Sequence, residues 1–203
     1  MNPGAGAGQP KSGRPLPDKS RLRIELTAAR AERHRDPDAD QRLVERALAA
    51  TAGARVVACY VARPEEPDTA GLLTALREAG VQVLLPVLTR VPDWAWFAGP
   101  DQLTPGPFGI SQPTGVRLGA SALALADVIW LPGLAGTVGG VRLGTGGGWY
   151  DRALLHARPD APRGLLLFDD EVRDQLPHDP WDQPIDLIVT ERRTITCGGQ
   201  PVE

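Results

Sequence analysis

Residues 139–152 decide how the rest of the chain is interpreted, and they read Gly139-Gly140-Val141-Arg142-Leu143-Gly144-Thr145-Gly146-Gly147-Gly148-Trp149-Tyr150-Asp151-Arg152. Glycine occupies six of the ten positions from 139 to 148. The apolar run at residues 127–132 predicts a buried strand before this stretch, and residues 151–157 predict a helix after it. A glycine loop between a strand and a helix presents free backbone N–H groups and the positive end of a helix dipole. It therefore predicts an anion-binding site.

This glycine loop differs from the two familiar phosphate-binding loops. No Gly-Lys-Ser/Thr follows it, as in a Walker A loop, and Trp149 stands where a dinucleotide-binding fingerprint would have its third glycine. Arg142 and Arg152 place fixed positive charge on either side, and Asp151 adds a carboxylate that could hold a metal ion. The alternative interpretation is a glycine-rich surface turn between a strand and a helix.

The composition describes one globular domain with little net charge. A chain of 203 residues can bury a substantial core, and a formal charge of −3 gives no basic surplus for nucleic-acid binding. No apolar run is long enough to span a bilayer and no signal segment is visible, so we expect a cytoplasmic monomer without a membrane partner. Cys59 and Cys197 are too few to indicate a disulfide framework or a zinc site.

The N-terminal part of the chain predicts a tail followed by two helices. Residues 1–17 are rich in Gly, Pro and Ala and predict a disordered tail, which leaves a single α/β domain at residues 18–203. Asp18 is a candidate N-cap for a basic helix that reaches about residue 34, and Asp36-Pro37 opens a second helix. Lys19 and Arg23 lie one turn apart on the first helix, so they can reach one anion together.

Short apolar runs alternate with helical segments along the remaining chain, which predicts a mostly parallel, Rossmann-like sheet flanked by helices in three layers. The runs that predict strands are residues 55–61, 81–86, 127–132, 163–168 and 186–190. Asp68 or Thr69 is expected to cap a helix between the first two. Ligands of such sheets lie at the carboxyl ends of the strands, where the glycine loop and the acidic pair Glu65-Glu66 both stand.

Residues 87–126 carry a less regular pattern. Trp94, Trp96 and Phe97 predict either a strand or a wall of the ligand site, and packing is the commoner use of such aromatics. Phe108 and Ile110 stand in a proline-rich loop and are expected to point inward.

Three groups of residues converge if the strands are parallel. They are the glycine loop with Arg142, the cations Lys19 and Arg23, and carboxylates from Asp151 and from Asp179 or Asp182. A phosphate cradle with cations and paired carboxylates for Mg²⁺ predicts a nucleoside-triphosphate site. No serine elbow or Cys–His pair indicates a covalent nucleophile, so catalysis would depend on positioning and charge stabilisation.

Structural explanations remain open for several of these polar residues. Asp179 and Asp182 stand close to prolines, where aspartate commonly forms turns, and His178 is expected on the surface. Glu66 could simply be solvated.

A Pro-Gly-Leu turn and the glycine loop together form a specific pattern. Residues 131–134, Leu-Pro-Gly-Leu, and residues 142–152 resemble the sequence Pro-Gly-Leu, a short spacer and Arg-Leu-Gly-x-Gly-x-Gly-Tyr-Tyr-Asp. This is the pattern of the 5-formyltetrahydrofolate cyclo-ligase family, also called 5,10-methenyltetrahydrofolate synthetase. Further family marks stand in order across about residues 18–190, namely Lys19-Ser20-x-x-Arg23, residues 60–66 with Thr69, Pro86, Phe108-Gly109-Ile110, Gln112-Pro113, and Asp182 with Asp186.

This resemblance implies an ATP- and Mg²⁺-dependent enzyme. Its substrate would be 5-formyltetrahydrofolate, with or without a polyglutamate tail, and its products 5,10-methenyltetrahydrofolate, ADP and phosphate. The implied mechanism transfers the γ-phosphoryl group to the formyl oxygen, closes the ring through N10 and then releases phosphate.

The resemblance also implies roles for individual residues. The residues that would bind ATP are Lys19, Arg23, Arg142, Leu143, Gly144, Thr145, Gly146, Gly147, Gly148 and Trp149. Arg142 and Tyr150 would be catalytic, and Asp151 and Asp182 would hold Mg²⁺. The residues that would form the folate pocket are Tyr60, Glu66, Trp149 and Tyr150.

Four positions depart from the family pattern. Trp149 replaces the usual first tyrosine, Gln112 replaces an acidic residue, Thr145 replaces a larger one, and residues 135–137 replace an aromatic residue and an aspartate. Two alternatives therefore stay open. One is a related protein that binds nucleotide or folate without turnover, and the other is an α/β enzyme that acts on a phosphorylated sugar without ATP.

Overall fold

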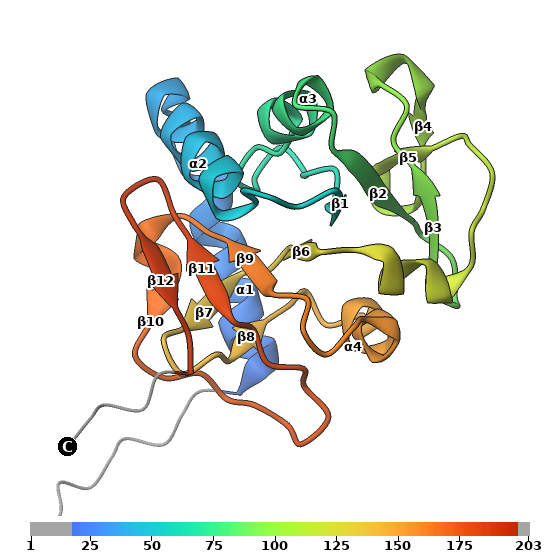
Figure 1. Cartoon of the computed structure of the whole chain (residues 1–203). Coiled ribbons are helices and arrows are strands. Elements are labelled where there is room, and N and C mark those ends of the chain that lie inside the picture. The colour runs from blue at the N-terminus through green and yellow to red at the C-terminus, as the bar shows by residue number, and fades with distance from the viewer. Residues whose placement is uncertain (1–17, 199–203) are drawn as a thin grey trace, which may run out of the picture.

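The apolar runs of the sequence form one central sheet, whose strands are β1 (Val56–Ala58), β2 (Gln82–Val87), β3 (Asp93–Trp96), β6 (Val128–Leu131), β9 (Arg163–Leu166), β11 (Leu187–Val189) and β12 (Thr194–Thr196). The computed structural model describes residues 18–198, and its sheet has the order β12-β11-β9-β6-β1-β2-β3 (Figure 1). The strands from β11 to β2 run parallel, while β3 and β12 are antiparallel at the two edges. The predicted α/β fold class is confirmed.

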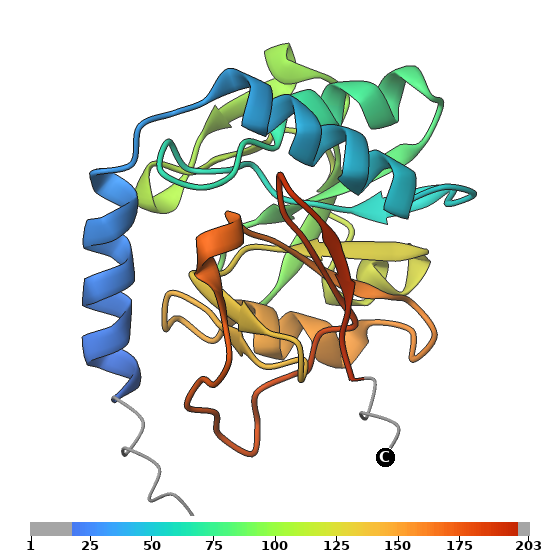
Figure 2. The same ribbon diagram turned by 90° about the vertical axis from the view of Figure 1, so that its left-hand side faces the viewer.

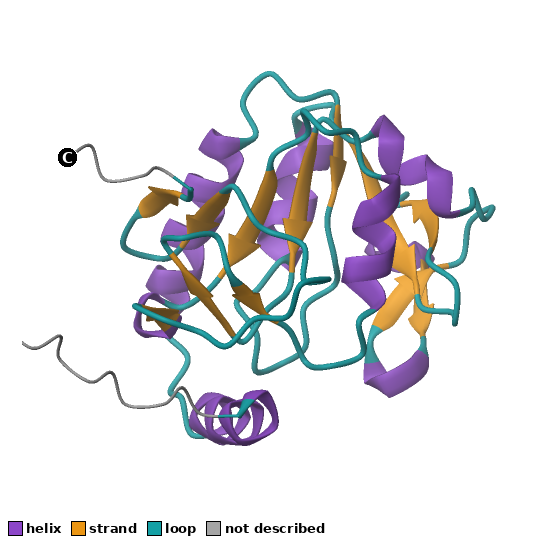
Figure 3. Cartoon of the chain, turned by 90° about the horizontal axis from the view of Figure 1, so that it is seen from below, coloured by secondary structure: helices purple, strands orange, loops and turns teal. Residues whose placement is uncertain are grey.

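Helices cover both faces of this sheet, as Figure 3 shows in purple around the orange strands. They are α1 (Lys19–Ala31), α2 (Pro37–Ala50), α3 (Ala70–Glu78) and α4 (Trp149–Ala153), with short 3₁₀ turns at Pro100–Gln102, Pro107–Gly109, Ala120–Leu125, Leu154–His156 and Asp169–Glu171. The predicted caps Asp18 and Asp36 accept the backbone N–H groups of Ser20 and Asp38. None of the helices in the described residues has the length and hydrophobicity that crossing a membrane requires.

Two apolar cores lie on opposite faces of the sheet. On one face, α2 and α3 pack over β1 and β2 through residues such as Leu43, Leu72 and Leu76. On the other, α4 and the neighbouring 3₁₀ turns pack through residues such as Leu123 and Leu154. Alternate residues of each strand enter opposite cores, which explains why the strands read as continuous apolar runs.

The order of the strands reverses beside β1. The chain passes from β1 to β2 on one side and then places β6, β9 and β11 successively on the other side. Loops that leave the carboxyl ends of β1 and β6 therefore diverge and leave a crevice between them. Such a switch point is where open parallel sheets bind their ligands.

A small second sheet carries α1. It has the order β10-β7-β8, with β7 at Ala135–Thr137, β8 at Arg142–Leu143 and β10 at Val172–Arg173. Leu22 and Leu26 of α1 pack with Leu134 and Leu143 in a separate apolar cluster. Figure 2 shows α1 running along one side of the molecule before the chain turns into α2.

The prediction for the glycine stretch was wrong in two details. The stretch does not follow β6 directly, because the β7–β8 hairpin intervenes and Gly139 and Gly140 form its turn. The loop proper is therefore residues 144–148. The helix after it is short, since α4 ends at Ala153, so backbone N–H groups and side chains contribute more here than a long helix dipole would.

Other expectations also changed. The strand predicted as the last one, β11, is followed by β12, which pairs with it in antiparallel orientation. Phe108 was expected to point inward, but it is 85% exposed and sits in the turn after β4 (Leu103–Pro105), before β5 (Ser111–Pro113). Arg30, on the predicted basic helix, is buried. The predicted tail at residues 1–17, and residues 199–203 of the predicted domain, lie outside the described residues.

Candidate active site

A cavity of about 1200 Å³ opens at the switch point of the sheet. It is bounded by the loops that follow β1, β2 and β6, by the glycine loop and α4, and by the start of α1. Every residue predicted to bind ATP, metal or folate lines it, namely Lys19, Arg23, Tyr60, Glu66, Arg142, Leu143, Gly144, Thr145, Gly146, Gly147, Gly148, Trp149, Tyr150, Asp151 and Asp182. The fold therefore brings together residues that lie far apart in the sequence.

The glycine loop allows cationic side chains to lie against its backbone. Gly146 has a φ of +102°, a backbone conformation that residues other than glycine rarely adopt. A Cβ at Gly144 would stand 2.8 Å from a guanidinium nitrogen of Arg142, so that position also requires glycine. Leu143 faces the α1 cluster with its side chain buried, so only its backbone can contact a ligand.

Arg142 stands two positions before the glycine loop. Its guanidinium donates to Asp151 Oδ1 at 2.8 Å and to the carbonyl oxygen of Pro132 at 3.3 Å. The side chain is buried, and its Nε has no hydrogen-bond partner within the described part of the chain. Arg142 is thus fixed in direction but retains a free donor.

Lys19 bridges two carboxylates of the loop that precedes β11. Its Nζ lies 2.6 Å from Asp179 Oδ2 and 2.5 Å from Asp182 Oδ2. Partial burial opposes the charge on Lys19 and on Asp182, but their hydrogen bonds outweigh it. The pKa of Lys19 is therefore raised and that of Asp182 lowered. Arg23 does not share this contact, since its Nε donates to the Gly144 carbonyl oxygen at 2.9 Å.

The two carboxylates predicted to hold a metal both face the cavity. Asp151 is engaged by Arg142 and Asp182 by Lys19. No group of three or more His, Cys, Asp or Glu residues arranged for a metal ion occurs between residues 18 and 198. These two carboxylates could therefore supply only part of a coordination shell.

The opposite side of the cavity is buried and aromatic. Tyr60 is 3% exposed, and its hydroxyl group has no hydrogen-bond partner among the residues that the structure describes. Glu66 is also buried, contrary to the solvated alternative, and its Oε2 accepts the N–H of Arg63 at 2.9 Å. Burial raises the pKa of Glu66 and raises that of Tyr60 well above its usual value, the latter with a contribution from Glu66.

Trp149 and Tyr150 form the junction between the two sides. The rings of Trp149 and Tyr150 pack edge to face with their centroids 4.9 Å apart. Trp149 makes a similar contact with Trp94, with a centroid distance of 5.5 Å. The indole N–H of Trp149 donates to the Thr89 carbonyl oxygen at 3.1 Å, so the tryptophan at this position is tied to the loop after β2. Trp94 is fully buried, which confirms packing as its role.

Sequence reasoning did not select several residues that line the cavity. They are Arg63, Leu88, Thr89, Arg90, Leu155, Trp181 and Gln183. Asp179, which had been named as an alternative carboxylate of the site, and Phe108 also line the cavity. Most of them stand in loops that follow parallel strands or precede β11. That position was the signal available in the sequence.

Comparison with known proteins identifies the family. The sequence model of the 5-formyltetrahydrofolate cyclo-ligase family matches residues 15–191. The chain belongs to this family. It is therefore an enzyme, a ligase of folate metabolism, and the substrate of the family is 5-formyltetrahydrofolate.

Individual relatives agree with the family match. The 5-formyltetrahydrofolate cyclo-ligase of Mycolicibacterium smegmatis is 37% identical over 150 residues, which cover 70% of this chain and 77% of the relative. The Escherichia coli K12 protein of the same name is 31% identical over 143 residues, covering 68% and 78%.

Solved structures share the fold. The 5,10-methenyltetrahydrofolate synthetase of Aquifex aeolicus superposes with a TM-score of 0.77 at 26% identity, covering 91% of this chain and 96% of that one. The synthetase of Mycoplasma pneumoniae, at 20% identity, has a TM-score of 0.65 over 86% of this chain and 99% of that one, and it supports the fold alone.

Proposed function

We propose that this chain uses ATP and Mg²⁺ to convert 5-formyltetrahydrofolate to 5,10-methenyltetrahydrofolate, with release of ADP and phosphate. One observation carries the proposal. A single cavity joins a cationic side, formed by Lys19, Arg23, Arg142 and residues 144–148, to an aromatic side, formed by Tyr60, Glu66, Trp149 and Tyr150. The first suits a triphosphate and the second suits a flat pterin ring.

On the cationic side, backbone N–H groups of the glycine loop would surround the terminal phosphates of ATP. Arg142, held by Asp151 and Pro132, would stabilise charge on the phosphoryl group during its transfer. Lys19 and Arg23 would contact the phosphates from α1 once Lys19 exchanges its carboxylate partners for phosphate oxygens.

The residues present fit a magnesium ion in part. Asp151 and Asp182 offer the carboxylate oxygens that Mg²⁺ prefers, and the ion commonly completes its shell with phosphate oxygens and water. When bound, Mg²⁺ would neutralise phosphate charge. Asp151 and Asp182 would then orient it beside the glycine loop.

The chemistry follows from the poor leaving ability of the formyl oxygen. Transfer of the γ-phosphoryl group to that oxygen forms an O–P bond and releases ADP. The N10 lone pair then attacks the formyl carbon, the C–O bond breaks, and the N10 proton leaves with the phosphate, which departs as hydrogen phosphate. The chain would contribute positioning and charge stabilisation, because both substrates would meet in the one cavity that Tyr150 and Asp151 line.

On the aromatic side, buried polar groups whose hydrogen-bonding capacity the protein does not fully use would bind the pterin. Tyr60 presents a buried hydroxyl group, and Glu66 a buried carboxylate that can accept the N–H donors of a pterin ring. Trp149 and Tyr150 would enclose the ring system between this pocket and the nucleotide.

The proposal is tested by incubating the protein with ATP, Mg²⁺ and 5-formyltetrahydrofolate while following the near-ultraviolet absorbance of the methenyl product. The expected result is an absorbance rise that depends on ATP and is matched by ADP release. Binding of both ligands without ADP release would instead support a non-catalytic relative. Failure of ATP to bind or to raise the melting temperature would favour an enzyme that acts on a phosphorylated sugar.

A further inference from the structure

The helix that presents Lys19 and Arg23 is anchored at its other end by a buried ion pair. Arg30 is 4% exposed and Glu171 is 3% exposed. The Arg30 Nε donates to Glu171 Oε1 at 2.7 Å, and one terminal nitrogen donates to Oε2 at 2.7 Å. This planar, two-point contact fixes the guanidinium in one orientation.

Both partners of this pair make further hydrogen bonds. The same terminal nitrogen of Arg30 donates to the Gly133 carbonyl oxygen at 2.6 Å, and Glu171 Oε2 also accepts the N–H of Phe168 at 3.1 Å. A buried ion pair contributes little net stability because both charges lose their hydration. Its measurable effect is to select one arrangement of the elements that it joins.

The elements that this ion pair fixes include the turn that holds Arg142, the arginine proposed to be catalytic. Arg30 binds the carbonyl oxygen of Gly133, and Arg142 binds that of Pro132, the preceding residue of the same turn. This turn is closely packed, because a Cβ at Gly133 would stand 2.7 Å from Leu165 Cδ1 and 3.3 Å from Arg142 Cγ. A displacement of Arg30 would therefore be passed to Arg142 as well as along α1.

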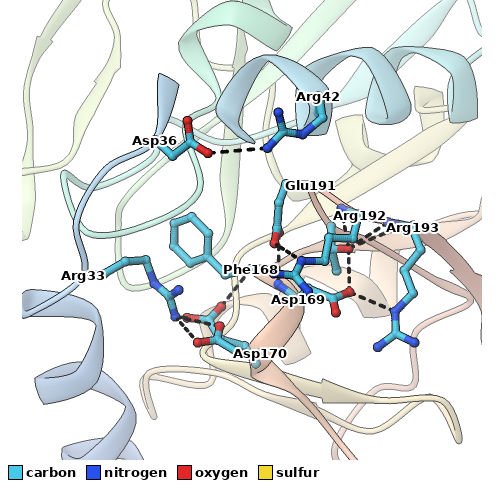
Figure 4. Close-up of polar contacts among 11 residues, drawn as sticks. Arg33, Asp36, Arg42, Phe168, Asp169, Asp170, Glu191, Arg192 and Arg193 are labelled. Carbon is cyan, nitrogen blue, oxygen red and sulfur yellow. Dashed lines mark hydrogen bonds and ion pairs between the residues drawn. The ribbon is translucent and has the colours of Figure 1, made fainter. Parts of the chain in front are cut away.

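An exposed pair lies just outside the buried one. Figure 4 shows Arg33 extending toward Asp170, with its guanidinium near the ring of Phe168. Arg33 binds Asp170 at 2.7 Å and lies 4.3 Å from the centre of that ring. The Asp170 side chain is 66% exposed, but Arg33 is half-buried and also lies 3.9 Å from Glu171 Oε1, so this second pair extends the buried contact.

We propose that Arg30 and Glu171 are positioning residues for the nucleotide, an inference that depends on the proposed function. They fix the direction of α1 and the Pro132–Gly133 turn, so that Lys19, Arg23 and Arg142 all face the glycine loop. Neither residue lines the cavity, and each acts through the groups that it holds.

Two variants test this role by calorimetric titration with ATP alone and with 5-formyltetrahydrofolate alone. Arg30→Lys keeps the charge, whose field also reaches Glu66, but a single ammonium group cannot reproduce the planar contact. Arg30→Met combined with Glu171→Met removes both charges, which spares the fold the cost of one unpaired buried ion. Arg42→Met, which removes an exposed arginine–aspartate pair with Asp36 and does not line the cavity, is the control.

We expect both Arg30 variants to lose ATP affinity by about tenfold or more. Their affinity for 5-formyltetrahydrofolate should stay within about twofold of the wild-type value, and the control variant should keep both affinities. Folded Arg30 variants with wild-type ATP affinity would overturn the inference. Equal losses for both ligands with a lower melting temperature would also overturn it, because they would show a purely structural role. If the double variant does not fold, Arg30→Lys decides. Wild-type protein that binds no ATP would refute the proposed function itself.

Discussion

The two sides of the cavity differ in how their polar groups are satisfied. On the cationic side, Lys19 and Arg142 are already paired with carboxylates of the same chain. On the aromatic side, the Tyr60 hydroxyl group is buried without a partner in the described structure, and Glu66 is buried with its pKa raised by that burial. Under the proposed function, ligand binding on the cationic side would require an exchange of ionic partners, whereas on the aromatic side it would supply a partner that the Tyr60 hydroxyl group lacks in the described structure.

This difference predicts separable effects of mutation. Changes on the cationic side should act on ATP and on chemistry, with little effect on folate binding. Changes on the aromatic side should act on folate binding, and they should alter stability because buried polar groups there cost free energy.

The largest effect on turnover is expected from a change at Asp151, where the cationic and aromatic sides of the cavity meet. Asp151→Asn removes the charge that holds Arg142 and a proposed metal ligand, so turnover should fall at least about 100-fold. The melting temperature should fall only modestly, because the amide oxygen of Asn can still accept the hydrogen bond of buried Arg142, and the affinity for 5-formyltetrahydrofolate should change little. Asp160→Asn, at an exposed carboxylate paired with Arg158, is the matched control. A loss of stability as large as the loss of activity would show that Asp151 is structural.

Lys19→Ala should lower the affinity for ATP by about tenfold, because a charge-assisted hydrogen bond to phosphate is lost. The affinity for 5-formyltetrahydrofolate should not change. Arg21→Ala, at an exposed position of the same helix, serves as control. Separate titrations with each ligand measure the two affinities, and the reverse ordering would refute the assignment of Lys19 to the nucleotide.

Glu66→Gln should weaken 5-formyltetrahydrofolate binding by about fivefold, because a charged acceptor becomes neutral. It should also raise the melting temperature at neutral pH. Burial raises the pKa of Glu66 above 4.5, so its favourable contribution to stability is present below that pH and is lost as pH rises through the folded-state value. The wild-type and variant melting temperatures should therefore converge on acidification. A variant that melts lower at neutral pH would contradict this account.

The smallest effect is expected when the Lys19–Asp182 ion pair is removed, and it concerns the pH dependence of stability. Against the opposing effect of burial, its hydrogen bonds hold the pKa of Asp182 below 3.8, so the pair stabilises the fold above that pH and the contribution is lost as pH falls further. Between about pH 7 and about pH 3 the wild-type protein should lose on the order of 1 kcal/mol more than Asp182→Asn. Thermal unfolding of both proteins across this range measures the difference, and parallel pH profiles would exclude a stabilising role for the pair.

Much of the fold could be predicted because its signals are local. The strands β1, β6 and β9 are covered on both faces and therefore read as apolar runs. The helices α1 and α2 begin at aspartates whose side chains bind the N–H group two residues later. By contrast, β8 and β10 have two residues each, too few to show a periodicity.

The parts of the site that lie within one short motif could be predicted from the sequence. Contacts between residues far apart in the sequence could not be predicted. The glycine loop and its neighbours lie within residues 142–151, whereas Arg30 and Glu171 are separated by 141 positions. Arg30 follows Leu22 and Leu26 at a spacing of four and so shares the buried face of α1, but the sequence does not reveal its partner. Phe108 could not be placed either, because its exposure follows from a φ of +59° in a turn whose geometry the sequence does not specify.

The contact between Lys19 and Asp182 joins segments 163 positions apart in the chain. A ribosome therefore makes the two partners at widely separated times. A nascent chain that has emerged only as far as the glycine loop still lacks the carboxylates that neutralise Lys19. Full assembly of the cationic side must wait until the loop before β11 has been synthesised.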